Sequence, residues 1–413
     1  MRPSVRNARG ANRRRVRTGR GHAGKTLGQR PTHVGASLVD ALALGLGQPR
    51  GLPLQSGCGV PPASLNSKRC NVKILITGGT GRVGANLARA LLDKGHDIRS
   101  FVYPGDQSRA RKLDDFDRVE TIEGDLRNLA DVRRAVEGVD AVYHIAAAFG
   151  GPFDNREYLE INGMGTINVL ESIRDLTPNL HRLVYASTEA IYWENPYNGR
   201  CFEEPIREDQ VARYQTMPYF LTKWIGEELV MSYHLQFGLP SVTTRFATII
   251  EPGEFLDANG LPHLFLFGPV YEQFKDREEA EELKALWTGE EQFLLSRNPD
   301  GRPYRQVYAD VRDIVQGLVL ALERDEAVGE VFNLGGAALF DWSEAVPYLA
   351  ERFGLGYADA RRPDWNYFEL DLTNIKQKLG FEPKHDLASI LDAAEAMRRG
   401  EDVGIIPTGV RFG

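Results

Sequence analysis

The chain has 413 residues, a formal net charge of −7 and 42% apolar residues, which is the composition of an ordinary globular protein. No apolar run approaches the roughly 20 residues that a membrane-spanning helix needs, so we expect no contact with a membrane. The three cysteines, Cys58, Cys70 and Cys201, are scattered. They lack the C-x-x-C spacing of a zinc site, and their small number suits a reducing compartment.

The first 70 residues differ in composition from the rest of the chain. They contain 13 Lys and Arg against the single acid Asp40, and they are rich in Gly and Pro. We predict that residues 1–70 form a disordered basic N-terminal extension. We favour an extension outside the working protein over an organellar transit peptide or a nucleic-acid-binding arm. The remainder is acidic, which argues against nucleic acid as a partner.

From Val72 onward, short apolar runs alternate with stretches of helical period. We expect strands at residues 72–76, 98–102, 119–122, 139–145, 182–186, 242–250 and 331–334. We expect helices at residues 85–92, 129–137, 157–175 and 311–324, and a further helix that begins near Pro218. This alternation predicts an α/β fold with a doubly wound parallel sheet (Rossmann fold) and helices on both faces.

Two stretches, residues 251–302 and 341–399, do not alternate in this way. We assign residues 71–250 to a Rossmann domain and residues 251–413 to a smaller C-terminal substrate lobe. The last Rossmann elements, at about 305–336, interrupt this lobe. We expect the lobe to cover the carboxyl edge of the sheet, where doubly wound proteins bind their ligands.

The sequence TGGTGRVG, residues 77–84, lies between the first strand and the first helix. Gly78, Gly81 and Gly84 provide a tight turn, a close approach of backbone to phosphate, and close packing of helix on strand. Together with Arg82 and Val83 they open a helix whose free amides bind a pyrophosphate. The spacing is Gly-x-x-Gly-x-x-Gly, and its place between strand and helix predicts a cradle for a dinucleotide.

Two further motifs carry candidate chemistry. Tyr219 and Lys223 are four residues apart on a predicted helix, so their side chains share one face. Lowering a tyrosine pKa by about 3 units requires about 4 kcal/mol, which a neighbouring lysine and a nicotinamide cation provide. Ser187 and Thr188 end a buried strand, where their hydroxyls face the ligand crevice. Either motif alone also occurs by chance, as a surface pair or a strand-end turn.

In this order, the motifs resemble the extended short-chain dehydrogenase/reductase superfamily, the group of NAD-dependent epimerases and dehydratases. The resemblance covers about residues 72–399. The other matching pieces are Gly124-Asp125-Leu126, His144-Ile145-Ala146-Ala147, Asn162 with residues 165–171, Arg245-Phe246, and residues 329–336.

The resemblance implies a role for each matching position. Tyr219 is the general base, Lys223 lowers the pKa of that tyrosine and holds the nicotinamide ribose, and Thr188 orients the reacting oxygen with Ser187 beside it. On the cofactor side, the implied residues are Gly78, Gly81, Arg82, Val83, Gly84, Tyr103, Asp125, Leu126, Ala146 and Lys223. A homodimer is also implied. The histidines share no metal-ligand spacing, so we expect no metal.

The choice between NAD and NADP stays open in the sequence. Relatives that prefer NAD end the second strand in an acid, and that place falls near Val102 or Tyr103 here. Relatives that use NADP often have an arginine there. Arg109, Arg111 and Lys112 lie just beyond, where they suit either a 2′-phosphate or a solvated helix face.

Departures from the family pattern narrow the reaction. Thr248 replaces an asparagine often used on the sugar nucleotide, and Arg305 is displaced by one residue from a frequent arginine. Both changes weaken the prediction of a nucleotide-sugar substrate. Glu189 is followed by Ala190 where sugar dehydratases have two acids, which argues against elimination. We therefore expect a sugar or nucleotide-sugar epimerase in the cytoplasm, or in an organelle if residues 1–70 are a transit peptide.

Two alternatives remain. The first is an NAD(P)-dependent alcohol or ketone dehydrogenase/reductase acting on a free sugar, sugar acid, steroid-like or flavonol-like alcohol. The second is a cofactor-sensing protein without turnover, which we disfavour because such proteins tend to lose the tyrosine and lysine. Neither residues 251–302 nor the segment around 365–368 contains a motif that identifies the substrate.

Overall fold

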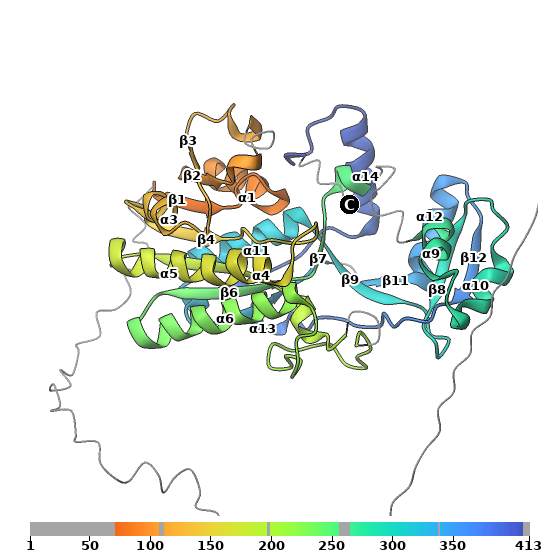
Figure 1. Cartoon of the computed structure of the whole chain (residues 1–413). Coiled ribbons are helices and arrows are strands. Elements are labelled where there is room, and N and C mark those ends of the chain that lie inside the picture. Colours follow the sequence, from red (N-terminus) through yellow and green to blue (C-terminus); the bar gives the residue numbers. More distant parts are fainter. Residues whose placement is uncertain (1–70, 107–110, 196–198, 256–264, 338, 408–413) are drawn as a thin grey trace, which may run out of the picture. The chain divides into compact units, whose positions relative to one another are not determined.

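The computed structural model describes residues 71–106, 111–195, 199–255, 265–337 and 339–407 (Figure 1). The predicted N-terminal extension, residues 1–70, and the basic residue Arg109 lie outside these ranges. The predictions made for them therefore stay predictions.

A seven-stranded sheet forms the centre of the described chain, and all of its strand pairs are parallel. The strand order is β10-β6-β5-β4-β1-β2-β3. The strands are β1 (Lys73–Thr77), β2 (Asp97–Val102), β3 (Val119–Glu123), β4 (Ala141–His144), β5 (Arg182–Thr188), β6 (Ser241–Phe246) and β10 (Val331–Leu334). The predicted doubly wound α/β fold is confirmed. The direction of winding reverses between β1 and β4, and the carboxyl ends of these strands open the crevice in which such folds bind ligands.

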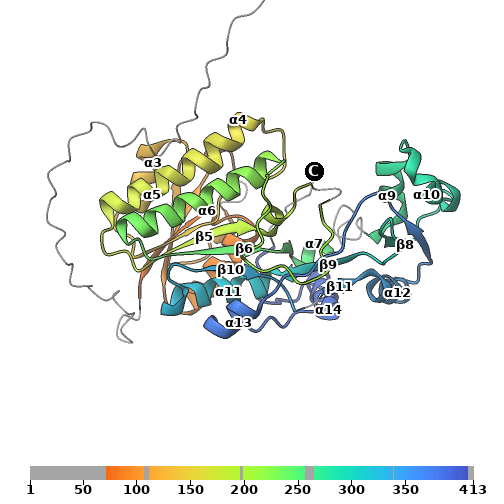
Figure 2. The same ribbon diagram turned by 90° about the horizontal axis from the view of Figure 1, so that it is seen from below.

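Helices cover both faces of this sheet, as Figures 1 and 2 show. Ile74 and Ile76 of β1 pack in the same cluster as α1 and α11, whereas Leu75 packs in the cluster of α3, α5 and α6. Successive side chains of the strand point to opposite faces of the sheet, so β1 contributes to the hydrophobic core on each face. The helices are α1 (Arg82–Asp93), α3 (Leu129–Val136), α5 (Gly165–Leu176), α6 (Pro218–Phe237) and α11 (Val311–Glu323).

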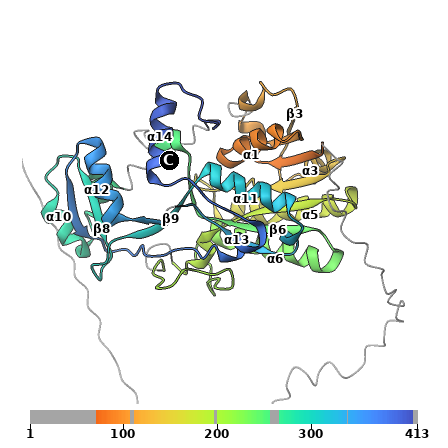
Figure 3. The same ribbon diagram turned by 180° about the vertical axis from the view of Figure 1, so that it is seen from behind.

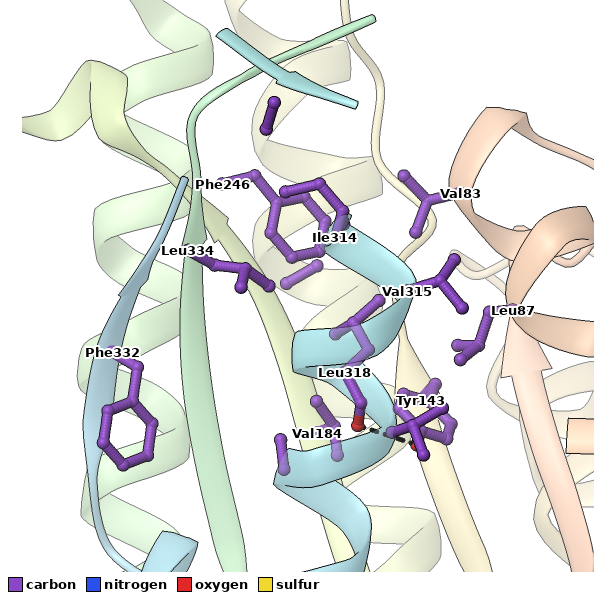
Figure 4. Close-up of a cluster of buried hydrophobic side chains, with 14 of the residues drawn as sticks. Val83, Leu87, Tyr143, Val184, Phe246, Ile314, Val315, Leu318, Phe332 and Leu334 are labelled. Atoms are coloured by element: carbon purple, nitrogen blue, oxygen red, sulfur yellow. Dashed lines mark hydrogen bonds between the residues drawn. The ribbon is translucent and has the colours of Figure 1, made fainter. Parts of the chain in front are cut away.

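Helix α11 lies beside α1 on one face of the sheet (Figure 4). Tyr143 of β4 donates its hydroxyl to the carbonyl of Leu318 over 3.0 Å, which satisfies a buried phenol. At Gly317 a Cβ would lie 2.2 Å from Leu334 Cδ1, so glycine allows the helix to pack directly on β10. This close packing fixes the far half of the sheet.

The structure divides two elements that the sequence predicts as single pieces. The strand expected at 242–250 leaves the main sheet at Ala247, whose amide donates to Leu334 O, and continues as β7 (Thr248–Ile250). β7 pairs with β9 (Arg305–Asp310), which pairs with β11 (Leu339–Asp341). The helix expected at 157–175 contains α4 (Asn155–Tyr158), a π-helical turn (Leu159–Met164) and α5. The spacing of apolar residues does not reveal where a helix changes its pitch or where a strand changes its pairing partner.

The lobe is built from both of the irregular stretches. Strand β8 (Phe293–Arg297) pairs with β12 (Tyr357–Arg361), which lies far later in the chain. Figure 3 shows these strands with α10 and α12. The remaining helices are α7 (Pro252–Phe255), α9 (Phe267–Phe274), α10 (Glu281–Leu286), α12 (Trp342–Phe353), α13 (Thr373–Leu379) and α14 (Leu387–Arg398). Helix α14 packs on α7.

Candidate active site

The glycine-rich loop between β1 and α1 has room for backbone only. Gly78 has a φ of +73°, and a Cβ there would lie 3.0 Å from the backbone of Ala146 after β4. A Cβ on Gly84 would lie 2.1 Å from the carbonyl of Gly78. Gly81 precedes α1 and provides no side-chain cap, so the first-turn amides of α1 have no helical carbonyl behind them. These features fit a pyrophosphate at the helix N-terminus.

The side chains of Arg82 and Val83 serve the packing of this loop. Arg82 donates to Ile249 O over 3.0 Å and forms an ion pair of 2.8 Å with Glu254. It thereby joins α1 to β7 and α7. Val83 is buried in the core beside α11. The side chains of Arg82 and Val83 are therefore used in packing, and the glycines and the backbone amides of the first turn of α1 remain for a ligand.

On the predicted adenine side, Tyr103 follows β2 and is 56% exposed. Asp125 follows β3 and binds Arg127 through Nε and Nη2, at 3.0 and 2.6 Å to Oδ2, which lowers the pKa of its carboxyl. Leu126 is buried against Gly165, where a Cβ would meet its side chain at 2.9 Å. The proposed contacts of these residues with a cofactor stay predictions.

The structure brings Tyr219 and Thr188 together. Tyr219 lies in the first turn of α6, where Pro218 occupies the first helical position, and its hydroxyl is close enough to that of Thr188, at the end of β5, for Thr188 to influence its pKa. The ring of Phe149 packs against Tyr219 at a centroid distance of 4.8 Å. Ser187 Oγ is buried with no hydrogen-bond partner among the described residues. Phe149 was not predicted as part of the site, because only the fold brings it there.

Burial shifts both predicted proton-handling groups away from their ionised forms. It raises the pKa of Tyr219, and the hydrogen bond from Thr188 opposes this shift. It lowers the pKa of Lys223 to about 7, which Glu227 opposes. Lys223 Nζ lies 4.4 Å from the centre of the Tyr185 ring. The protein alone therefore keeps the phenol protonated.

Two buried polar residues, Asn162 and His144, hold the surroundings of this pair in place. Asn162, in the π-helical turn, donates through Nδ2 to Ala148 O and to Thr222 Oγ1 over 3.1 and 3.0 Å, and accepts from the Ala148 amide. His144 lies between the hydroxyls of Thr77 and Thr166 at 2.9 and 3.0 Å, and burial lowers its pKa to about 3. His144 is a neutral structural residue.

A buried ion pair lies one turn beyond Lys223. Arg245 of β6 donates to both carboxylate oxygens of Glu227, with the shortest distance 2.7 Å. It also donates to Glu208 O and to the hydroxyl of Tyr192. The network joins α6, β6 and the loop before α6.

A second polar network, which sequence reasoning missed, begins at Glu189 and extends into the lobe. Glu189 is buried, and its Oε1 accepts from the amide and hydroxyl of Thr248 over 3.0 and 2.9 Å. Thr248 accepts from Gln306, which in turn accepts from Asn366. The only sequence signal was the position of Glu189 directly after Thr188.

No helix within the described ranges is long and apolar enough to span a membrane. The same residues contain no cluster of three or more His, Cys, Asp or Glu that could hold a metal ion.

Comparisons with known proteins agree with this fold. The model of the NAD dependent epimerase/dehydratase family matches residues 74–335. The UDP-glucose 4-epimerase of Corynebacterium glutamicum is 28% identical over 334 residues, which cover 79% of this chain and 95% of that protein. A short-chain dehydrogenase/reductase superfamily protein from Agrobacterium tumefaciens, crystallised with NAD, is 31% identical. Its TM-score is 0.68, with 79% of this chain and 97% of that chain covered.

A shorter match points to a reductase. The 2-alkyl-3-oxoalkanoate reductase of Stenotrophomonas maltophilia is 36% identical over 188 residues, which cover 44% of this chain and 52% of that protein. The chain therefore matches about half the length of that reductase. The family model, by contrast, spans the sheet from β1 to the end of β10. The chain belongs to the NAD dependent epimerase/dehydratase family and is an enzyme of the extended short-chain dehydrogenase/reductase type.

Proposed function

We propose that this enzyme is a nucleotide-sugar epimerase that inverts a carbinol carbon with a nicotinamide cofactor retained in the site. The observation that carries the proposal is the proximity of two hydroxyls, those of Tyr219 and Thr188, at the carboxyl edge of the sheet. Lys223 lies one turn further along the same helix and is buried. The full-length similarity to a UDP-glucose 4-epimerase supports the sugar-nucleotide substrate.

The glycine loop fits the cofactor, because side chains at Gly78 and Gly84 would collide with backbone atoms. The loop and the first turn of α1 would hold the pyrophosphate, and Lys223 would hold the ribose. A nicotinamide held there would supply hydride transfer from and back to the carbinol carbon.

The residues of this chain then move the proton. Thr188 fixes the substrate hydroxyl by a hydrogen bond, and Tyr219 accepts the proton of that hydroxyl. Because burial raises the pKa of Tyr219, it becomes a base only when positive charge is close. In the reverse step, Tyr219 returns the proton to the ketone oxygen. Inversion follows if the sugar turns over between the two steps and presents its other face.

Substitution Tyr219→Phe tests the base. We expect turnover of UDP-glucose, followed by NMR of the sugar protons, to fall at least about 1,000-fold, while NAD binding changes less than about 3-fold. Tyr357→Phe, at an exposed tyrosine of the lobe, is the matched control. Unchanged turnover in the Tyr219 variant would remove this residue from the mechanism.

A second candidate is a reductase that releases its cofactor, which the partial match to the oxoalkanoate reductase favours. Mass spectrometry of gently purified and then denatured protein separates the two. Near-stoichiometric NAD or NADP supports the epimerase and identifies the dinucleotide. Empty protein that binds added NADPH or NADH reversibly supports the reductase.

A further inference from the structure

Three buried polar atoms with no hydrogen-bond partner among the described residues lie on one side of the active site. They are Glu189 Oε2, Trp193 Nε1 and Arg200 Nε. The guanidinium carbon of Arg200 lies 4.0 Å from the centre of the Trp193 ring. The charges of Arg200 and Glu189 influence each other, although no direct ion pair joins them. Buried polar atoms are nearly always satisfied in folded proteins, so this cluster indicates a ligand.

The cluster is close to the reacting groups. Glu189 directly follows Thr188 in the chain. Trp193 packs against Phe220 at a centroid distance of 5.8 Å, and Phe220 is adjacent to Tyr219. A ligand atom held here would therefore lie near the proposed reacting groups.

The cluster has one positive charge in excess. Besides Glu189, the groups that face Arg200 are Asp364, Tyr304 and Tyr308. Asp364 is already bound by Arg362 through two hydrogen bonds of 3.0 Å, and by the Tyr304 hydroxyl. Burial raises the pKa of Glu189 to about 8, so this acid is neutral near pH 7. Arg200 is left as the uncompensated charge, which is costly when partly buried.

We propose that Arg200, seated on Trp193 and beside Glu189, binds a carboxylate carried by the sugar of the substrate. This inference rests on the proposed function and narrows its substrate to an acidic sugar. A guanidinium and a carboxylate are planar and pair through two N–H···O bonds.

The neighbouring groups complement a carboxylate, which can only accept hydrogen bonds. Oε1 of Glu189 accepts two hydrogen bonds from Thr248, so the proton of the neutral acid resides on Oε2. That O–H and the indole N–H of Trp193 are both donors without partners.

Calorimetric titration of the full chain with NAD added tests the proposal. The probes are UDP-glucuronate and UDP-glucose, which differ at C6 by carboxylate against hydroxymethyl, and UDP alone. We expect the wild type to prefer UDP-glucuronate by about 10- to 100-fold. Arg200→Gln should abolish this preference and leave UDP-glucose and UDP affinities within about 3-fold. Arg200→Lys should retain part of the preference, because the charge stays but the planar fork is lost.

Arg207→Gln is the matched control, since Arg207 lies in the same segment but is exposed. It should behave as the wild type. Equal weakening of all three probes by Arg200→Gln would assign Arg200 to the phosphates and overturn the proposal. So would a preference that Arg200→Gln leaves intact, provided that melting curves show a folded variant.

If the wild type binds no uridine nucleotide, free glucuronate and glucose are titrated as the same pair. The absence of an Arg200-dependent preference in both pairs overturns the proposal. The readout is binding, so it is separate from turnover. A protein that prefers the acid through Arg200 but epimerises neither sugar would contradict the proposed function alone.

Discussion

Glu189 is the side chain through which pH acts on the candidate carboxylate site. Burial raises its pKa to about 8, and the hydrogen bonds from Thr248 and the charge of Arg200 oppose this shift. The carboxyl is neutral below this pKa and ionised above it. Burial raises the pKa of Tyr304 and Tyr308 beside Arg200 well above this range.

Affinity for UDP-glucuronate should therefore fall above about pH 8, because an ionised Glu189 repels the ligand and compensates Arg200. We expect Glu189→Gln, which keeps a neutral side chain of the same shape, to flatten this profile. Calorimetric titration at pH 6.5, 7.5, 8.5 and 9.5 measures the effect. A parallel fall in the variant would assign the pH dependence to another group.

His144 makes folding stability depend on acid. Its pKa is about 3 in the folded protein, because of burial, against about 6.5 in an unfolded chain. The unfolded state alone binds this proton between these values, so stability is complete above about pH 6.5 and is lost as the pH falls toward 3. The slope is about 1.4 kcal/mol per pH unit.

Urea unfolding of wild type and His144→Asn at pH 7, 6 and 5 tests this prediction. We expect the variant to be less stable at pH 7, because contacts with Thr77 and Thr166 are altered, but to lose less stability on acidification. His385→Asn, at a partly exposed histidine, is the control. Equal acid slopes in wild type and His144→Asn would contradict the assignment.

At the scale of elements, α6 carries the proposed reacting groups, Tyr219 and Lys223, and its position depends on Gly226. A Cβ there would lie 1.9 Å from the Tyr185 hydroxyl on β5. Gly226→Ala should push α6 away from β5 and displace Tyr219 and Lys223. We expect turnover to fall at least about 10-fold and stability to fall by about 1–3 kcal/mol.

Gly356→Ala is the matched control, since a Cβ there would meet only Gln292 Oε1, at 3.9 Å. It should change neither the epimerisation rate nor the urea midpoint. A fully active Gly226→Ala would show that the helix absorbs the extra methyl without moving its first turns.

The helices and strands were predictable where the spacing of apolar residues stays constant along the whole element. The seven strands of the main sheet and its covering helices follow from apolar alternation, and the glycine loop follows from its place between strand and helix. The point at which the strand leaves the main sheet, at Ala247, was not predictable, because the residues on both sides of it favour a strand. The Glu189, Trp193 and Arg200 cluster was hidden for another reason. The groups that surround the cluster, such as Thr248, Tyr304 and Asp364, come from separate segments. In the sequence, the cluster residues look like ordinary surface polar residues, and only their burial in the fold distinguishes them.

At the scale of the molecule, one buried ion pair joins several segments of the Rossmann domain. Glu227 of α6 binds Arg245 of β6, and Arg245 reaches Tyr192, which hydrogen-bonds to Asn333 of β10. Glu227→Gln leaves the guanidinium buried without its counter-charge. We expect a loss of about 3–5 kcal/mol in the free energy of unfolding.

Equilibrium urea unfolding measures this loss. Glu272→Gln is the control, because Glu272 forms a surface pair with Lys275 and its removal should have little measurable effect. Similar midpoints for the two variants would mean that the buried pair contributes no more than a surface pair.

The pairing of β8 with β12 also sets an order of assembly during synthesis. A nascent chain that has emerged as far as Leu334 contains every strand of the main sheet, but the partner of β8 begins only at Tyr357. Until then β8 lacks this neighbour and presents an edge to which other chains could add. The main sheet can thus be complete on the ribosome while the lobe that contains β8 still waits for the last part of the chain.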